Sequence, residues 1–377
     1  MSQDDDVVKA TLPVWVFCQM FGLCFSSTKA IASTKIPSRK RNVGKFVYWF
    51  ATVSIALHLS FYNFSYELDP SKNVVIQAGD ILNGLSSIAA TVSSIFTSFL
   101  FENRILTVMK DLCEVNDKLK KYPKSISYKG IKKFAYAEII YLLNSWIYFL
   151  ISYVITCPSN LAECLGSWYL MYTITKIFDV NLARFISHMS IVYKQLCTLN
   201  SNILHLSEER YVISLNLPKE RYKIDALENF KEIYSEILRI GEEINYVHSF
   251  SLLLIIANQF ISIFSSLYFC FFGYYINGNY IKPNSLSTLL VPLMSLIHPG
   301  GQLLAIAIVC QLTISESKQT GKIIYRIPIN RNARTLMQRI NLFSLHIMHK
   351  QFDITACGFF SINCALLLMV GIDPPIY

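Results

Sequence analysis

Seven long apolar stretches constrain this chain more than any other feature of its sequence. Each has at least about 20 residues, the length that crosses a bilayer as an α-helix. Only 16% of the residues are charged, whereas a soluble domain carries about 25%. The pattern therefore predicts an all-α membrane protein with one seven-helix domain over residues 1–377. The predicted spans are residues 46–66, 77–101, 134–156, 161–193, 247–275, 285–312 and 352–372.

Lysine and arginine are distributed very unevenly between the segments that connect these spans. One set of alternate segments holds 30 of them and the other set holds 2. Positive residues stay on the cytoplasmic side of a membrane, so the N-terminus is predicted inside and the C-terminus outside. This accounts for the net charge of +9 without a nucleic-acid partner, and it argues against a G-protein-coupled receptor, whose helices start from outside. The basic segments are 1–45, 102–133, 194–246 and 313–351, and the others are 67–76, 157–160 and 276–284.

The sequence carries no enzyme motif. We find no H-E-x-x-H zinc motif, no G-x-S-x-G nucleophile motif and no glycine-rich phosphate loop. Ten cysteines are scattered without a C-x-x-C pair, which indicates neither a zinc site nor a redox motif. We therefore predict a non-enzyme with no cofactor and no metal.

Three further features concern the ends of the spans. The apolar stretch 12–24 is short and indicates a helix at the membrane interface rather than another span. Asn63 begins the one N-x-[ST] sequon and falls at the predicted outer end of the first span, so we predict glycosylation there. Cys157 and Cys164 flank a short outer connection and are candidates for a disulfide.

Charged residues inside the predicted spans are functional candidates, because an unpaired charge in hydrocarbon is costly. Lys176 and Asp179 are three apart and lie on one helix face. Two interpretations stay open, namely an ion pair that holds helices together and a Lys176 that borders a water-filled ligand cavity.

The predicted outer half of the membrane also collects aromatic and small polar residues, which are typical of a small-molecule pocket. The competing explanation for the tryptophans and tyrosines is the aromatic belt of any membrane protein. The candidate ligand-binding residues are Asp80, Asn83, Trp146, Tyr153, Trp168, Tyr172, Lys176 and Ser266.

The end of the chain carries a recognisable sequence pattern. Its residues are Phe343-Ser344-Leu345, Phe352, Thr355-Ala356-Cys357-Gly358-Phe359-Phe360 and Leu366, preceded by Glu316-Ser317-Lys318-Gln319-Thr320. These residues resemble the last cytoplasmic helix and the seventh-helix region of the insect gustatory receptors. The order of spans and the lengths of their connections resemble that family over nearly the whole chain.

The resemblance implies a multi-pass receptor of the plasma membrane, surrounded by lipid, that acts as a ligand-gated cation channel for a small-molecule tastant. It further implies a homo- or heterotetramer with other receptor subunits, whose four seventh helices line one pore. Leu367 and Val370 would suit a hydrophobic gate. With helical spacing added, the candidate pore-lining residues are Phe360, Asn363, Leu367 and Val370.

The wording departs from the family pattern after Gly371. The family continues with threonine–tyrosine, five hydrophobic residues and glutamine–phenylalanine, whereas this chain continues Asp373-Pro374-Pro375-Ile376-Tyr377. A helix that begins at Phe352 would be about 31 Å long and one that begins at Phe360 about 20 Å, against a hydrocarbon core of about 30 Å. The alternative interpretation is a truncated, non-conducting family member that modulates full-length receptor partners. A secondary transporter is disfavoured, since no matching pair of broken spans is present.

Overall fold

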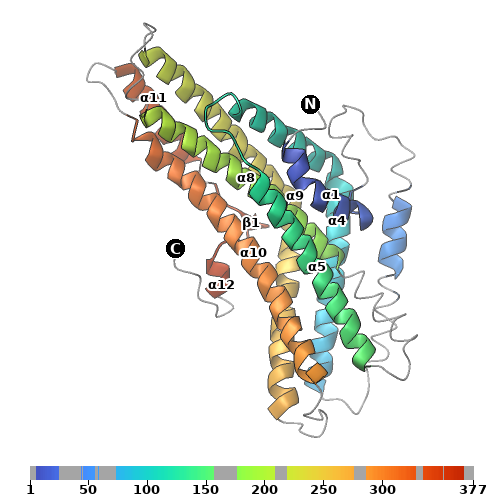
Figure 1. The fold of residues 1–377 in the computed structure, drawn as a ribbon. Helices are drawn as coiled ribbons and strands as arrows, with labels where there is room; N and C mark the ends of the chain where they lie inside the picture. Colours follow the sequence, from blue (N-terminus) through green and yellow to red (C-terminus); the bar gives the residue numbers. More distant parts are fainter. Residues whose placement is uncertain are drawn as a thin grey trace.

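A computed structural model describes residues 6–24, 44, 46–55, 58, 74–156, 176–208, 219–275, 286–327, 334–350 and 352–368. These residues form a bundle of long helices with one small hairpin (Figure 1). The helices are α1 (Asp6–Met20), α4 (Val74–Leu119), α5 (Lys129–Thr156), α8 (Ile177–Glu208), α9 (Lys219–Tyr275), α10 (Leu286–Ile324), α11 (Arg334–His349) and α12 (Ala365–Leu368), and the strands are β1 (Thr355–Ala356) and β2 (Phe360–Ser361).

Two helices are far longer than a bilayer is thick. α9 has 57 residues and α4 has 46, which correspond to about 86 Å and about 69 Å, against a hydrocarbon core of about 30 Å. Ion pairs join their charged halves, with Arg239 Nη2 lying 2.7 Å from Asp111 Oδ2 and Arg104 Nη1 lying 3.2 Å from Glu243 Oε1. Each helix therefore combines an apolar part that fits a membrane with a charged part that suits water.

Four of the predicted spans are present in the described residues as helices long and apolar enough to cross a membrane. These are α4, α5, α9 and α10, which correspond to the second, third, fifth and sixth predicted spans. Of the first span, only the shorter helix Phe46–Ile55 is described. The fourth span enters the described residues at Lys176, and Asn63, Cys157 and Cys164 lie outside them.

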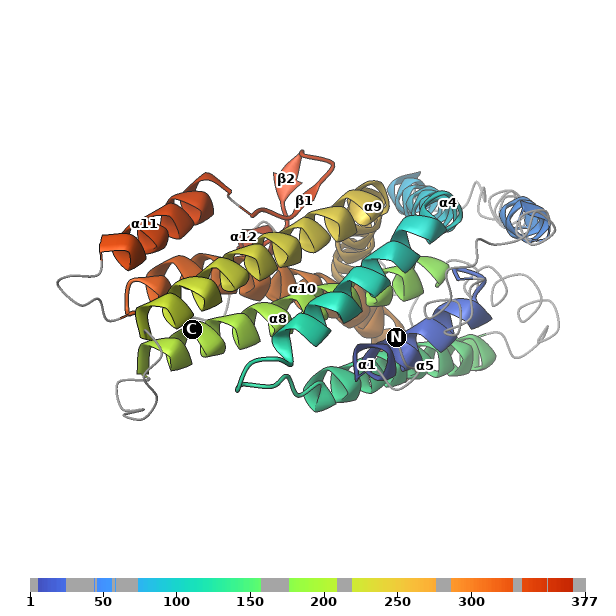
Figure 2. The ribbon, with the colours of Figure 1, turned by 90° about the horizontal axis from the view of Figure 1, so that it is seen from above.

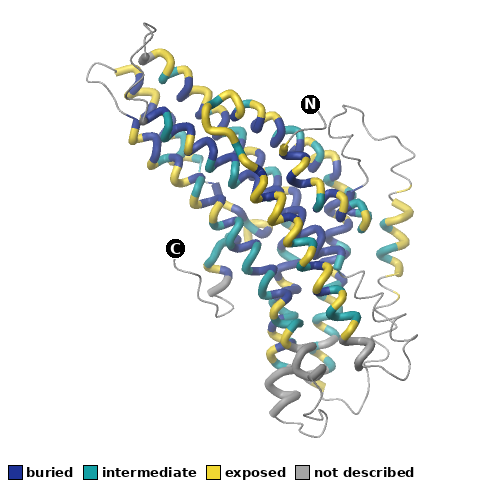
Figure 3. Tube along the Cα trace, viewed as in Figure 1, coloured by how far each residue is buried: buried dark blue, intermediate teal, exposed yellow. Residues whose placement is uncertain are grey.

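Helix α8 is the centre of the bundle. All residues from Ile177 to Val192 are buried, and the helix contacts α1, α4, α5, α9 and α10 (Figure 3). Its polar side chains have partners on the surrounding helices. Asn181 Nδ2 donates to Ser251 Oγ at 3.1 Å, and Arg184 Nη2 donates to Ser98 Oγ at 2.9 Å. Because these groups are hydrogen-bonded, a helix of only moderate apolarity can be buried on all sides.

Helix α1 is held to this centre by its C-terminal turn. Gly22 has a φ of 67°, a conformation that favours glycine at the end of a helix. The Leu23 amide donates to the Cys18 carbonyl at 2.8 Å, which closes the turn. The Leu23 carbonyl then accepts a bond of 3.0 Å from Arg184 Nη1. α1 therefore packs into the bundle with one side and exposes Leu12, Val16 and Met20 on the other.

Seen from above, the smaller elements lie on opposite sides of the long helices. α11 and the β1–β2 hairpin lie beside α9, whereas α1 and α5 lie on the other side of α8 (Figure 2). Tyr325 Oη, at the end of α10, donates to Ser344 Oγ of α11 at 2.7 Å. The hairpin is attached to α9 by Ser249.

The prediction of a continuous helix from Phe352 to Ile372 is wrong. The structure has an antiparallel hairpin there, in which Thr355 pairs with Ser361 and Ala356 pairs with Phe360. A helix begins only at Ala365 and is described as far as Leu368. The alternative start near Phe360 is closer, but that residue also lies in a strand.

The local reason for the hairpin is the turn at Cys357 and Gly358, whose φ angles are 51° and 75°. Such angles interrupt a helix and suit a tight turn. The Ser249 hydroxyl of α9 accepts a bond of 2.6 Å from the Cys357 amide and donates to the Thr355 carbonyl at 3.2 Å. A contact from a distant helix thus favours a turn within an apolar stretch.

Candidate ligand-binding site

Three ionisable side chains meet inside the bundle. Lys176 Nζ lies 2.9 Å from Asp179 Oδ2 and 2.8 Å from His298 Nε2, and the same Asp179 oxygen lies 3.1 Å from His298 Nε2. The side-chain exposures are 13% for Lys176, 1% for Asp179 and 7% for His298. The ion pair predicted from the three-residue spacing is therefore present at the start of α8, and its contacts with His298 connect it to α10.

Helix α5 reaches the same cluster through Tyr141. The Tyr141 hydroxyl donates to the His298 carbonyl at 3.0 Å, and the two rings stack with centroids 5.3 Å apart. Gly301 makes this approach possible, since a Cβ atom there would lie 2.9 Å from the Tyr141 oxygen. His298 and Tyr141 were not among the sequence candidates. The sequence feature that could have identified His298 is its place within an apolar span, because an ionisable residue inside a membrane span is a candidate functional residue.

A small cavity adjoins the cluster. Its free space is about 10 Å³, roughly what one water molecule needs. The Trp146 ring is one wall, with its centroid 5.4 Å from that of Phe21. The cavity is lined by Phe17, Phe21, Leu142, Trp146, Lys176, Asp179 and Val180. Helices α1, α5 and α8 thus border a site that holds very little free space.

Two buried polar atoms of the cavity-lining residues have no hydrogen-bond partner among the described residues. They are Nε1 of Trp146, a donor, and Oδ1 of Asp179, an acceptor. Buried polar groups are normally paired, so each is available to a bound molecule. The site can therefore offer one hydrogen-bond donor and one acceptor between aromatic walls, which is the usual composition of a small-molecule site.

Two other sequence candidates lie in a separate set of contacts between α4 and α9. Asn83 Oδ1 accepts a bond of 2.7 Å from Ser262 Oγ, and Ser266 Oγ donates to the Ser262 carbonyl at 2.7 Å. Asn258, which sequence reasoning missed, accepts from Ser86 and Ser87 on the same α4 face at 2.8 Å and 2.9 Å. These residues hold two helices together and do not line the cavity.

The remaining ligand candidates are only partly visible. Asp80 lies on α4 and Tyr153 on α5, but the structure does not describe their side chains. Trp168 and Tyr172 lie outside the described residues. Within the described residues, no group of three or more His, Cys, Asp and Glu side chains could hold a metal ion.

The predicted pore-lining residues do not share one helix. Phe360 lies in β2, and Asn363 precedes α12 and caps it, because its Oδ1 accepts a bond of 2.9 Å from the Ala365 amide. The helical spacing that grouped these two residues is therefore wrong. Leu367 lies on α12 with a side chain that is not described, and Val370 lies outside the described residues.

Comparisons with known proteins agree across the chain. The family model described as "7tm Chemosensory receptor" matches residues 11–372. In sequence, 147 residues are 23% identical to the Drosophila melanogaster protein named "Gustatory receptor for bitter taste 66a". This match covers 39% of the chain and 28% of that protein, so the matched part spans little more than a quarter of the length of the relative.

In structure, the chain is similar to the insect olfactory receptor OR5 from Machilis hrabei. The TM-score is 0.70 at 12% identity, and the match covers 97% of this chain and 96% of that one. The structure of that receptor in complex with eugenol gives a TM-score of 0.67 at 12% identity, with 97% and 94% covered. At this identity the likeness establishes a shared fold.

Proposed function

This chain belongs to the 7tm chemosensory receptor family, and from that premise we propose that it is a subunit of a ligand-gated cation channel that detects a small-molecule tastant. As a member of that family it is a receptor and not an enzyme. We place it in the plasma membrane with its N-terminus in the cytoplasm, in line with the distribution of lysine and arginine.

The observation that carries the ligand part of the proposal is the junction of α1, α5, α8 and α10. There two buried atoms, Nε1 of Trp146 and Oδ1 of Asp179, have no hydrogen-bond partner among the described residues. A tastant with one acceptor and one donor, attached to a flat or apolar body, would fit this combination. The free space of about 10 Å³ is far below the several hundred Å³ of a typical ligand pocket. We therefore assign this conformation to a closed state.

Gating then follows from differential binding. A ligand shifts a conformational equilibrium only as far as it binds one state better than the other. Entry of a tastant has to move Trp146 on α5 away from the Lys176–Asp179 pair on α8. The tastant therefore binds the state in which these helices are further apart, and we infer that this state is the conducting one.

The relatives support the proposed class of ligand. The sequence match is to a receptor named for bitter taste, and the structural match includes a receptor in complex with eugenol, a small aromatic compound. Both are consistent with a small organic ligand between aromatic walls. We accordingly propose a bitter or similar plant-derived compound rather than an ion or a peptide.

Helix α11 supports assembly into an oligomer. Its exposed apolar residues are Met337, Leu342, Leu345 and Met348, of which Met348 is 71% exposed. The charge distribution places this helix in the cytoplasm, where lipid cannot cover it. An exposed apolar face in water indicates a protein partner. We propose a homo- or heterotetramer in which α11 contributes to the contact between subunits.

The test is a current recording from cells that express the chain, with a panel of bitter compounds, in wild type and Trp146→Phe. Phenylalanine keeps an aromatic wall but removes the N–H group. We expect the half-maximal concentration to rise about tenfold, which corresponds to one lost hydrogen bond in a desolvated site. Trp49→Phe is the matched control, because Trp49 Nε1 is also buried without a partner among the described residues but does not line the cavity.

Two results would contradict the proposal. Equal shifts of the half-maximal concentration for Trp146→Phe and Trp49→Phe, at equal surface expression, would mean that the ligand does not bind at this junction. Currents that do not depend on any tested compound would contradict ligand gating itself. Native mass spectrometry of the purified protein tests the oligomer separately, and a monomer would contradict it.

A further inference from the structure

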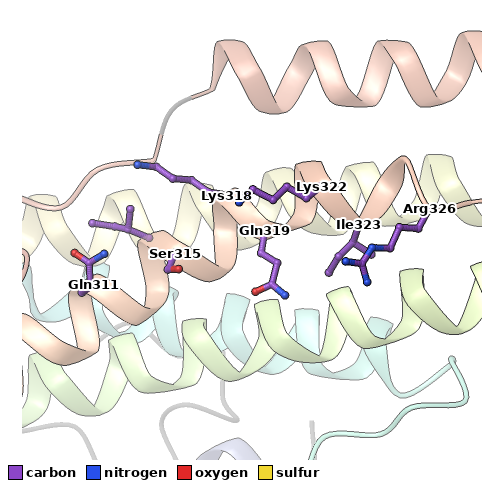
Figure 4. Close-up of a pocket in the computed structure, with 8 residues that line it drawn as sticks. Gln311, Ser315, Lys318, Gln319, Lys322, Ile323 and Arg326 are labelled. Atoms are coloured by element: carbon purple, nitrogen blue, oxygen red, sulfur yellow. The ribbon is translucent and has the colours of Figure 1, made fainter. Parts of the chain in front are cut away.

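A groove lies far from the ligand site, on the charged end of α10. Its volume is about 340 Å³, enough for a small ligand. Ile314 and Ile323 form a buried floor, and the remaining side chains are polar or basic. They lie along the end of α10 and the turn that follows it, from Gln311 to Arg326 (Figure 4). The lining residues are Gln311, Ile314, Ser315, Lys318, Gln319, Lys322, Ile323 and Arg326.

The three cations of this groove have no counter-charge among the residues that the structure describes. Lys318, Lys322 and Arg326 make no ion pair with any described residue, and no acidic residue lines the groove. The neighbouring Glu316 is engaged elsewhere, since its Oε1 accepts a bond of 2.8 Å from Asn200. Some other cations near the same end of the bundle are paired. Arg339 Nη1, for example, lies 2.7 Å from Glu228 Oε1.

The three cations lie close together although no carboxylate lines the groove to neutralise them. Lys318 and Lys322 are four residues apart on α10, and Arg326 follows in the turn just after the helix ends at Ile324, so all three lie near one another. Like charges at this spacing destabilise a helix. The hydroxyl of Ser315 and the amide of Gln319 line the same groove and have no hydrogen-bond partner among the described residues. The groove thus presents positive charge and free hydrogen-bonding groups on one face.

We propose that this groove binds a ligand with several phosphate groups. Phosphate groups are anions with multiple acceptor oxygens, which match lysine and arginine donors. A ligand with several phosphates can contact all three cations, because Lys318 and Lys322 are about 6 Å apart along the helix and Arg326 lies in the turn that follows. A single carboxylate would satisfy only one or two of them.

Two sources could supply this chemistry, a free inositol polyphosphate and the headgroup of a phosphorylated inositol lipid. The predicted sixth span ends at Leu312. Lys318 is then about 9 Å beyond the hydrocarbon core along the helix, and the end of the helix at Ile324 is about 18 Å beyond it. The near end of the groove is therefore within reach of lipid headgroups, and the far end is in water.

The experiment uses the full-length protein in nanodiscs, with inositol hexakisphosphate as the free probe and isothermal titration calorimetry as the readout. The groove variant is K318Q/K322Q/R326Q. The matched control K121Q/K132Q/K133Q removes the same charge from exposed lysines outside the groove. We expect the control to bind as wild type does. The groove variant should lose at least about tenfold in affinity, since all three cations that contact the phosphates are removed.

A second arm distinguishes the two sources. Nanodiscs that contain phosphatidylinositol bisphosphate should weaken binding of the free probe if the lipid headgroup occupies the groove, and leave it unchanged if the natural ligand is soluble. Lys322→Gln alone gives a milder variant, should the triple substitution melt at a lower temperature than the control.

Two outcomes overturn the inference. One is wild-type protein that does not bind the probe in either nanodisc, and the other is a groove variant that binds as tightly as the control. If the groove variant changes the oligomeric mass and wild type does not bind the probe, the groove is a contact between copies of the chain. This experiment measures binding and records no current. A failure of the phosphate-binding inference is therefore distinguishable from a failure of the channel proposal.

Discussion

Removal of one charge from the Lys176–Asp179 pair should destabilise the protein far more than removal of both. Asp179 is 1% exposed, and its Oδ2 lies 2.9 Å from Lys176 Nζ and 3.1 Å from His298 Nε2. Lys176→Met leaves this carboxylate buried beside a histidine alone, and Asp179→Asn leaves the ammonium without its counter-ion. Loss of one partner of a buried ion pair costs about 3–5 kcal/mol. A double variant has no unpaired charge, and it should be less destabilised than either single variant.

The assay is denaturant-induced unfolding of the purified protein in detergent micelles, followed by tryptophan fluorescence. The four free energies of unfolding form a double-mutant cycle, and we expect a coupling energy of about 3 kcal/mol. The exposed pair Arg339–Glu228 is the control. Its atoms are closer, at 2.7 Å, but its side chains are 50% and 48% exposed, so its coupling should be about 0.2–1 kcal/mol. Equal coupling energies in the two cycles would refute the reasoning.

Two further predictions concern the part of the bundle near the hairpin and α11. Gly241→Ala places a Cβ atom 2.7 Å from Cζ of the buried Phe352, so we expect a lower melting temperature in spite of the better helix propensity of alanine. Phe352→Leu should reverse the sign, and a higher melting temperature in the wild-type background would contradict the argument. Burial, together with Lys231 and Lys350, holds the pKa of His346 below its usual value. The unfolded chain then binds more protons below pH about 6.5, so stability should fall as pH is lowered through that value, and His346→Gln should flatten the profile of melting temperature against pH.

Hydropathy predicted the long helices because it reports the one property on which they depend, an uninterrupted apolar length. It did not report where a helix stops inside such a length. The stretch around Cys357 and Gly358 is apolar, yet it turns, because the backbone there has positive φ angles and Ser249 of α9 binds the turn. That contact joins residues 108 apart in sequence. The local sequence pattern around the turn therefore could not predict this contact.

The site divides in the same way. The Lys176–Asp179 pair follows from helix geometry, since residues three apart share a face. His298 lies 122 residues from Lys176, and its place beside the pair depends on how α8 packs on α10. Asn83 and Ser266 were grouped with Trp146 because all lie in the predicted outer half. The structure separates them, because depth in a membrane fixes one coordinate of a residue and says nothing of its neighbours across the bundle.

The position of His298 along α10 bears on how a small ligand could move so long a helix. His298 is followed by Pro299, Gly300 and Gly301. Proline lacks the backbone N–H of a helical residue and glycine lowers helix stability, so this is where α10 is easiest to bend. Three contacts hold it straight there, from Lys176, Asp179 and Tyr141. A ligand that competes for the Asp179 carboxylate weakens one of these contacts at the point of least stiffness. The far end of α10, which is hydrogen-bonded to α11 through Tyr325, can then change direction. The helices between the ligand site and α11 need not unfold for this to happen.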